Sequence, residues 1–104
     1  MDADILYHKL MQAGNDWADK QAAHNILEDT KTAVLAQLML KSQATSVAAK
    51  EIEAKASKEF TEHVHNTQEA MKAALKAKVN YESIKTWIDL KRSEEATRRA
   101  EMKL

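Results

Sequence analysis

The 104-residue chain contains no proline, no cysteine and a single glycine, Gly14. Without proline and glycine, it lacks the residues that most often end helices and form turns. Alanine, lysine, glutamate and leucine dominate what remains, and all of them favour helices. This composition is typical of long helices or coiled coils, so we expect an all-α protein.

Several other absences limit the function. The lack of cysteine excludes disulfides and thiolate metal sites. Sixteen basic and sixteen acidic side chains give a net charge of zero. No overall field therefore attracts the chain to nucleic acid or to an anionic membrane, and such binding requires local segregation of charge. The first residues are acidic, unlike a signal peptide, and no apolar run approaches the roughly 18 residues of a membrane span. We expect a soluble, cytoplasmic protein with no membrane partner.

Apolar residues between positions 2 and about 41 recur at the spacing of a helix. At about 100° per residue they share one face, made of Leu6, Leu10, Ala13, Trp17, Leu27, Val34, Leu35 and Leu38. Lys20, His24 and Lys31 point along the same face and interrupt it. Gly14 lies off this face and costs about 1 kcal/mol relative to alanine, so we expect a weak point in the helix there.

The one cluster of small polar residues spans 42–46, where Thr45 or Ser46 suits a helix N-cap. We place a hairpin turn in this segment, and so short a connection makes the flanking helices antiparallel neighbours. A second helix is expected from about 47 to 103. Its first apolar face is made of Phe60, Val64, Met71 and Leu75.

The apolar pattern of the second helix changes near residue 78. The next apolar cluster is Tyr81, Ile84, Trp87 and Ile88, and its mean direction is rotated by roughly 140° from the earlier face. Either the helix breaks and Asn80 caps a third helix, or one helix continues and turns a second apolar face to another molecule. We favour a continuous or gently kinked helix. The expected fold is a long, coiled-coil-like antiparallel helical hairpin in one domain.

The length of the first helix bears on self-association. With the turn at 42–46, the first helix is too short to reach Trp87, Ile88 and Leu90. Exposed apolar residues in a row usually mark an interface. We therefore predict a homo-oligomer with Ile84, Trp87 and Ile88 at the interface, whereas Trp17 is assigned to the core.

No motif in the sequence predicts catalysis. Glu62 and His65 have the Glu-x-x-His spacing of di-iron bundles, but such a site needs a second motif that the first helix does not supply. His63 and His65 point about 160° apart on a helix, so they do not chelate one ion together. A glycine-rich phosphate loop and a nucleophile elbow are also missing. We expect no enzyme activity, no metal, no cofactor and no small-molecule substrate.

Segregated charge provides the candidate binding site. Lys78, Lys85, Arg92 and Arg99 are spaced by sevens, which places them on one helix face about 10 Å apart. Tyr81 lies beside Lys85. Cations for phosphates and rings for base stacking are what a single-strand groove requires. We predict these five residues as nucleic-acid-binding. The alternative is a solvated face whose charges pair along the helix, as Glu95 can with Arg99.

The stretches Tyr81–Ile88 and Lys91–Arg99 complete a small, cysteine-free, helical chain that resembles short all-helical proteins of tailed phages. In general shape it also resembles the phage recombination-mediator family, a likeness of pattern and composition over most of the chain. Members of that family are helical, form rings or barrels and help to load a recombinase on single-stranded DNA. The resemblance implies a non-enzymatic accessory of phage DNA recombination or replication, in the host cytoplasm, that contacts single-stranded DNA or a recombination protein. The basic positions would then face DNA. The alternative is a protein-interaction module, such as an adaptor or a phage-encoded inhibitor of a host factor.

Overall fold

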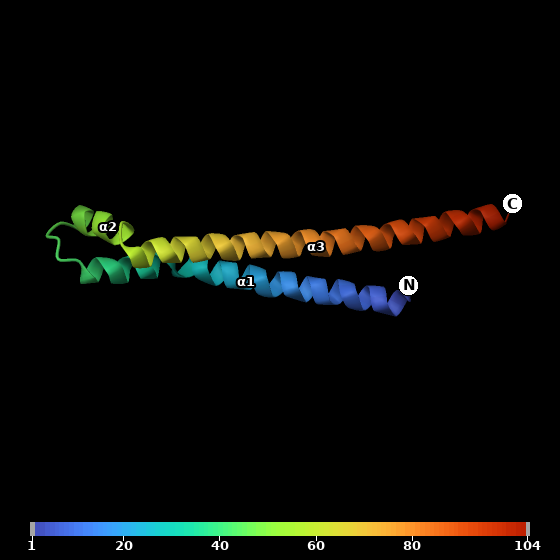
Figure 1. The fold of residues 1–104 in the computed structure, drawn as a ribbon, viewed down its shortest axis with the longest axis horizontal. Coiled ribbons are helices and arrows are strands. Elements are labelled where there is room, and N and C mark those ends of the chain that lie inside the picture. Colours follow the sequence, from blue (N-terminus) through green and yellow to red (C-terminus); the bar gives the residue numbers. More distant parts are fainter. Residues whose placement is uncertain (1, 104) are drawn as a thin grey trace. The chain divides into compact units, whose positions relative to one another are not determined.

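The structure, a computed structural model, describes residues 2–103, and its helices are α1 (Ala3–Lys41), α2 (Val47–Lys55) and α3 (Lys58–Met102) (Figure 1). None of these residues forms a strand, which confirms the expected all-α helical hairpin. Two compact units divide the chain. Unit 1 contains the described residues up to Asp19 and those from Leu75 onward, and unit 2 is Lys20–Ala74. Within residues 2–103, no helix combines the length and the apolar character needed to cross a membrane.

The connection after α1 lies in the predicted place. Residues 42–46 are not helical, and Ser46 caps α2 because its side-chain oxygen accepts a hydrogen bond from the backbone N–H of Ala49, at 3.1 Å. The Ser42 hydroxyl donates to the Glu53 carboxylate at 2.7 Å, which ties the connection to α2. Of the two residues that suit an N-cap at this point in the sequence, the structure uses Ser46.

The prediction of one helix from about 47 to 103 is wrong, because the chain breaks after α2. The Ser57 side chain forms hydrogen bonds on both sides of the break. Its hydroxyl donates to the carbonyl of Ala54 at 2.6 Å, at the end of α2, and accepts from the backbone N–H of Phe60 at 3.2 Å, in the first turn of α3. A serine N-cap thus starts α3 without glycine or proline.

In unit 2, α1 presents the face that the sequence predicts. Leu27, Val34, Leu35 and Leu38 are half-buried, whereas Lys31 is exposed. On the α3 side of this seam Phe60 is buried as expected, but smaller or polar residues follow it: His63, Thr67, Ala70 and Ala74. All are buried or half-buried at spacings of three and four. Met71 was placed on the packed face by sequence, and this is wrong, since it is 45% exposed.

In unit 1, α3 runs through Asn80 without a break and continues the same spacing with Ala77, Tyr81, Ile84 and Ile88. Leu75, which the sequence placed on the packed face, is 54% exposed. The apparent rotation of the apolar face therefore has a simple origin. Large residues such as Leu75 point outward, and alanines continue the inner seam.

Gly14 belongs to the seam of unit 1 rather than lying off it. A Cβ atom added to Gly14 would lie 3.4 Å from Cε2 of Tyr81, so the glycine lets the ring approach the backbone of α1. The Tyr81 ring also packs on Trp17, with centroids 5.5 Å apart. Helix α1 is continuous through this point. The position where a weak point was expected is instead the place where the Tyr81 ring of α3 packs against α1.

Candidate functional site

The four cations of the predicted site lie on α3 in unit 1, and we call them the basic row: Lys78, Lys85, Arg92 and Arg99. Lys78 and Lys85 each follow a seam residue by one position, so the row lies along the edge of the seam with α1. All four side chains are exposed. The structure therefore brings together the cations that the heptad spacing predicts.

The members of the basic row differ in their surroundings. The Lys78 ammonium lies 5.9 Å from the centre of the Trp17 ring, a cation–π contact. Arg99 lies 3.8 Å from the Glu95 carboxylate, as the alternative interpretation expects. Lys85 and Arg92 form no ion pair within the part of the chain that the structure describes. The middle of the row is thus the part that has charge available for a ligand.

Tyr81, the predicted base-stacking residue, is not on the open side of the row. It is half-buried in the seam between Trp17 and Gly14. Tyrosine at this position completes the heptad of seam residues on α3, which accounts for its inward direction. The tyrosine therefore stabilises the hairpin, and the basic row has cations without an adjacent exposed ring from this residue.

The predicted oligomer interface is also corrected. Ile88 is only 5% exposed and borders a small cavity with Leu6 and Tyr7 of α1. Ile84 is half-buried in the same register. Both side chains thus pack within unit 1, in the seam with α1. The first helix reaches Ile88 because α2 and the break after it occupy residues 47–57, so α3 begins later in the sequence than a turn at 42–46 alone would place it. Trp87 remains 38% exposed.

Sequence reasoning missed an uncharged surface on α3, which we call the outer groove: Val79, Ser83, Thr86, Leu90, Ser93 and Thr97. These residues are spaced alternately by four and three, as in a second coiled-coil seam, and all are exposed. Two grooves that meet at Leu90 run along them. The signal was present in the sequence as an uncharged heptad register within a highly charged segment.

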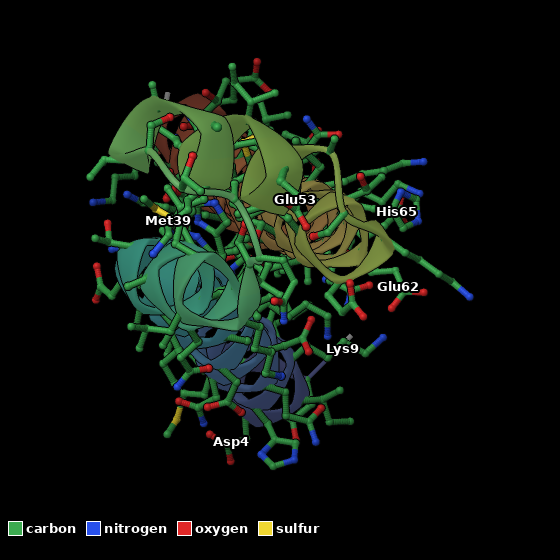
Figure 2. The ribbon with its side chains drawn as sticks, turned by 90° about the vertical axis from the view of Figure 1, so that its left-hand side faces the viewer. Asp4, Lys9, Met39, Glu53, Glu62 and His65 are labelled. Atoms are coloured by element: carbon green, nitrogen blue, oxygen red, sulfur yellow. The ribbon has the colours of Figure 1, made fainter. Side chains whose placement is uncertain are left out.

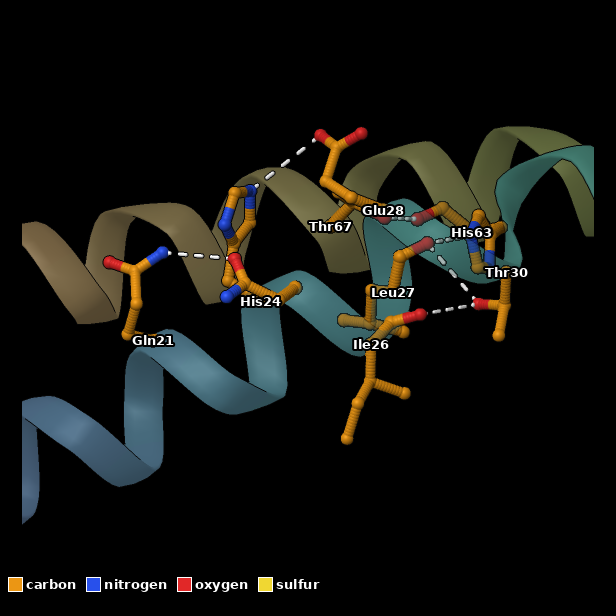
Figure 3. Close-up of polar contacts among 9 residues, drawn as sticks. Gln21, His24, Ile26, Leu27, Glu28, Thr30, His63 and Thr67 are labelled. Atoms are coloured by element: carbon orange, nitrogen blue, oxygen red, sulfur yellow. Dashed lines mark hydrogen bonds and ion pairs between the residues drawn. The ribbon is translucent and has the colours of Figure 1, made fainter.

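Glu62 and His65 lie on the outside of α3. Figure 2 shows both side chains pointing away from the helices, and both are exposed. His63 points instead into the seam of unit 2, where its Nε2 lies 2.9 Å from the carbonyl oxygen of Leu27 (Figure 3). Among residues 2–103 there is no group of three or more potential metal ligands.

His24 introduces a polar defect into the same seam. Both of its ring nitrogens are buried and lack a hydrogen bond among the described residues. The Glu28 carboxylate lies 3.6 Å from Nε2, beyond hydrogen-bond distance (Figure 3). The Thr30 hydroxyl donates within α1, to the carbonyls of Ile26 and Leu27. The seam of unit 2 therefore contains a polar side chain whose buried nitrogens have no hydrogen bond among the described residues.

No protein-family model, curated protein or solved structure matches the chain.

Proposed function

We propose that this chain is a non-enzymatic binding protein that contacts single-stranded nucleic acid through the basic row. The observation that supports this proposal most directly is the pair Lys85 and Arg92, exposed on one helix face and without an ion pair among the described residues. The two charges are about 10 Å apart along the helix. A phosphate backbone can meet both cations along one strand.

The surroundings of the row determine the expected mode of binding. Because Tyr81 packs in the seam, the contact rests on charge rather than on base stacking. Binding of this kind depends steeply on salt and little on base sequence. It fits an accessory protein of DNA recombination or replication, which the phage resemblance suggests.

The test is titration of a labelled single-stranded oligonucleotide at several salt concentrations. The logarithm of the affinity falls as the logarithm of the salt concentration rises. Replacing Lys85 and Arg92 by glutamine should make this slope shallower by about 1.4, since each phosphate contact contributes about 0.7 for single strands. The matched control replaces two exposed cations of α3 outside the row, Lys72 and Lys76, by glutamine. Absence of binding by the wild type at low salt would contradict the proposal, as would equal weakening in the control.

A second candidate function is protein interaction. The outer groove favours it, because Val79 and Leu90 are 61% and 57% exposed on the same helix that carries the basic row. Uncharged residues at coiled-coil spacing, with Val79 and Leu90 among them, are suited to another helix. This candidate corresponds to an adaptor or to an inhibitor of another protein, and it uses a different face of α3 from the nucleic-acid proposal.

A further inference from the structure

The outer groove has acidic residues on both of its edges. Glu82 lines the first half of the groove, and Glu94 and Glu101 line the second half. Asp89 lies next to Leu90 in sequence, on the same edge as Glu82. Arg98 is the cation that borders the second half. An uncharged centre is thus bounded by carboxylates along much of its length.

Most of these carboxylates have charge available for a partner. Glu82, Asp89 and Glu101 form no ion pair within residues 2–103, and Glu94 pairs with Lys91 at 3.6 Å. All are exposed. Residues at the edges of a coiled-coil seam decide which helix pairs with it, because opposite charges attract and like charges repel across the seam. The edges of this groove therefore select against an acidic helix.

A second copy of α3 does not meet this requirement through the same groove. If two outer grooves faced each other, the carboxylates at their edges would also face each other, in either relative direction of the helices. Asp89 would oppose an acidic residue in both cases. The charge pattern calls for a helix whose edges are basic.

We infer that the outer groove binds an amphipathic helix of another protein, with an uncharged seam flanked by lysine or arginine. The inference deepens the protein-interaction candidate and does not depend on nucleic-acid binding. From Val79 to Thr97 the groove extends about 27 Å at about 1.5 Å per residue, enough for between two and three heptads. Val79 and Leu90 supply apolar contact within the uncharged centre. The charged edges supply selectivity and direction more than affinity.

The experiment uses the full chain and two labelled synthetic helices of about three heptads. Both peptides have alanine and leucine at the seam positions, and they differ in having lysine or glutamate at the edge positions. Fluorescence anisotropy should show binding of the lysine peptide in preference to the glutamate peptide. The charge-reversed variant E82K/D89K/E101K should prefer the glutamate peptide. Relative to the wild type, its affinity should fall about tenfold for the lysine peptide and rise about tenfold for the glutamate peptide.

Leu90→Ser should weaken binding of the lysine peptide, because it removes the side chain shared by both halves of the groove. Met71→Ser is the matched control, since it removes another exposed apolar residue of α3 outside the groove. Equal binding of the two peptides by the wild type would overturn the inference, and so would unchanged binding by Leu90→Ser.

Two further measurements separate the possible occupants of the groove. If Leu90→Ser lowers the mass of the chain in the absence of peptide, a second copy occupies the groove and the inference is wrong. Oligonucleotide binding should be the same in Leu90→Ser and in the wild type, because Leu90 is outside the basic row. Failure of the peptide experiment thus does not contradict the nucleic-acid proposal. Failure of the oligonucleotide experiment likewise does not contradict the inference about the outer groove.

Discussion

At the scale of single residues, His24 is the least favourable member of the packed seam. A buried polar group without a hydrogen bond costs about 1–3 kcal/mol, because it gives up its bonds to water. Both ring nitrogens of His24 are in this situation, and the Glu28 carboxylate, 3.6 Å from Nε2, is too distant for a hydrogen bond. Leucine at this position would extend the apolar face that Leu27 and Trp17 belong to.

His24→Leu is therefore expected to raise the free energy of unfolding by about 1 kcal/mol more than the same change at an exposed histidine. His65→Leu is the matched control, because it makes the same change of helix propensity on the outside of α3. Urea unfolding followed by circular dichroism measures both. Equal gains, or a loss at His24, would mean that the ring nitrogens are satisfied in solution.

At the scale of elements, one side chain forms hydrogen bonds on both sides of the break between α2 and α3. Ser57 bonds to the last turn of α2 and to the first turn of α3, so it compensates for backbone groups that a helix end leaves unpaired. No glycine or proline adjoins the break.

Ser57→Ala should lower the free energy of unfolding by about 1 kcal/mol, the usual cost of losing an N-cap. Ser93→Ala is the control, because Ser93 is exposed within α3 and has no capping role. Thermal unfolding of the two variants provides the measurement. A stabilised Ser57→Ala variant would show that α2 and α3 join into one helix once the cap is removed.

The two faces of α3 also belong to this scale. The inner seam uses Thr67, Ala70, Ala74 and Ala77, which let two helices approach closely but bury little apolar area each. The outer groove has the larger exposed Val79 and Leu90. A search for large apolar residues therefore assigns parts of the outer face to the core, as happened for Leu75.

At the scale of the whole molecule, self-association stays a prediction, and Trp87 is the member of the predicted interface that the structure leaves accessible. Trp87 lines the first half of the outer groove and also borders a separate groove with Leu6 and Lys91, where the Lys91 ammonium lies 5.8 Å from its ring centre. If two copies meet there, Trp87→Asp should lower the mass measured by light scattering, since a carboxylate in an apolar contact is unfavourable. A wild-type mass of 11.7 kDa at all concentrations would refute the prediction.

The sequence by itself determined the all-α class, the first helix, the connection at 42–46 and the packed face of α1. These features follow from local causes, namely helix propensity, the polar cluster with its Ser46 cap and the spacing of large apolar residues such as Leu27 and Leu38. The basic row was predictable for the same reason, because a spacing of seven fixes a common face of any helix.

Only the tertiary structure decided where α3 begins and which of its faces meets α1. A serine cap competes with continued helix by a small free energy, so Ser57 alone did not reveal the break. Alanines can lie on either face of a helix, and the partner helix decides which of them are buried. For that reason Tyr81 and Ile88 turned out to face α1, and the uncharged register through Leu90 was left for another molecule.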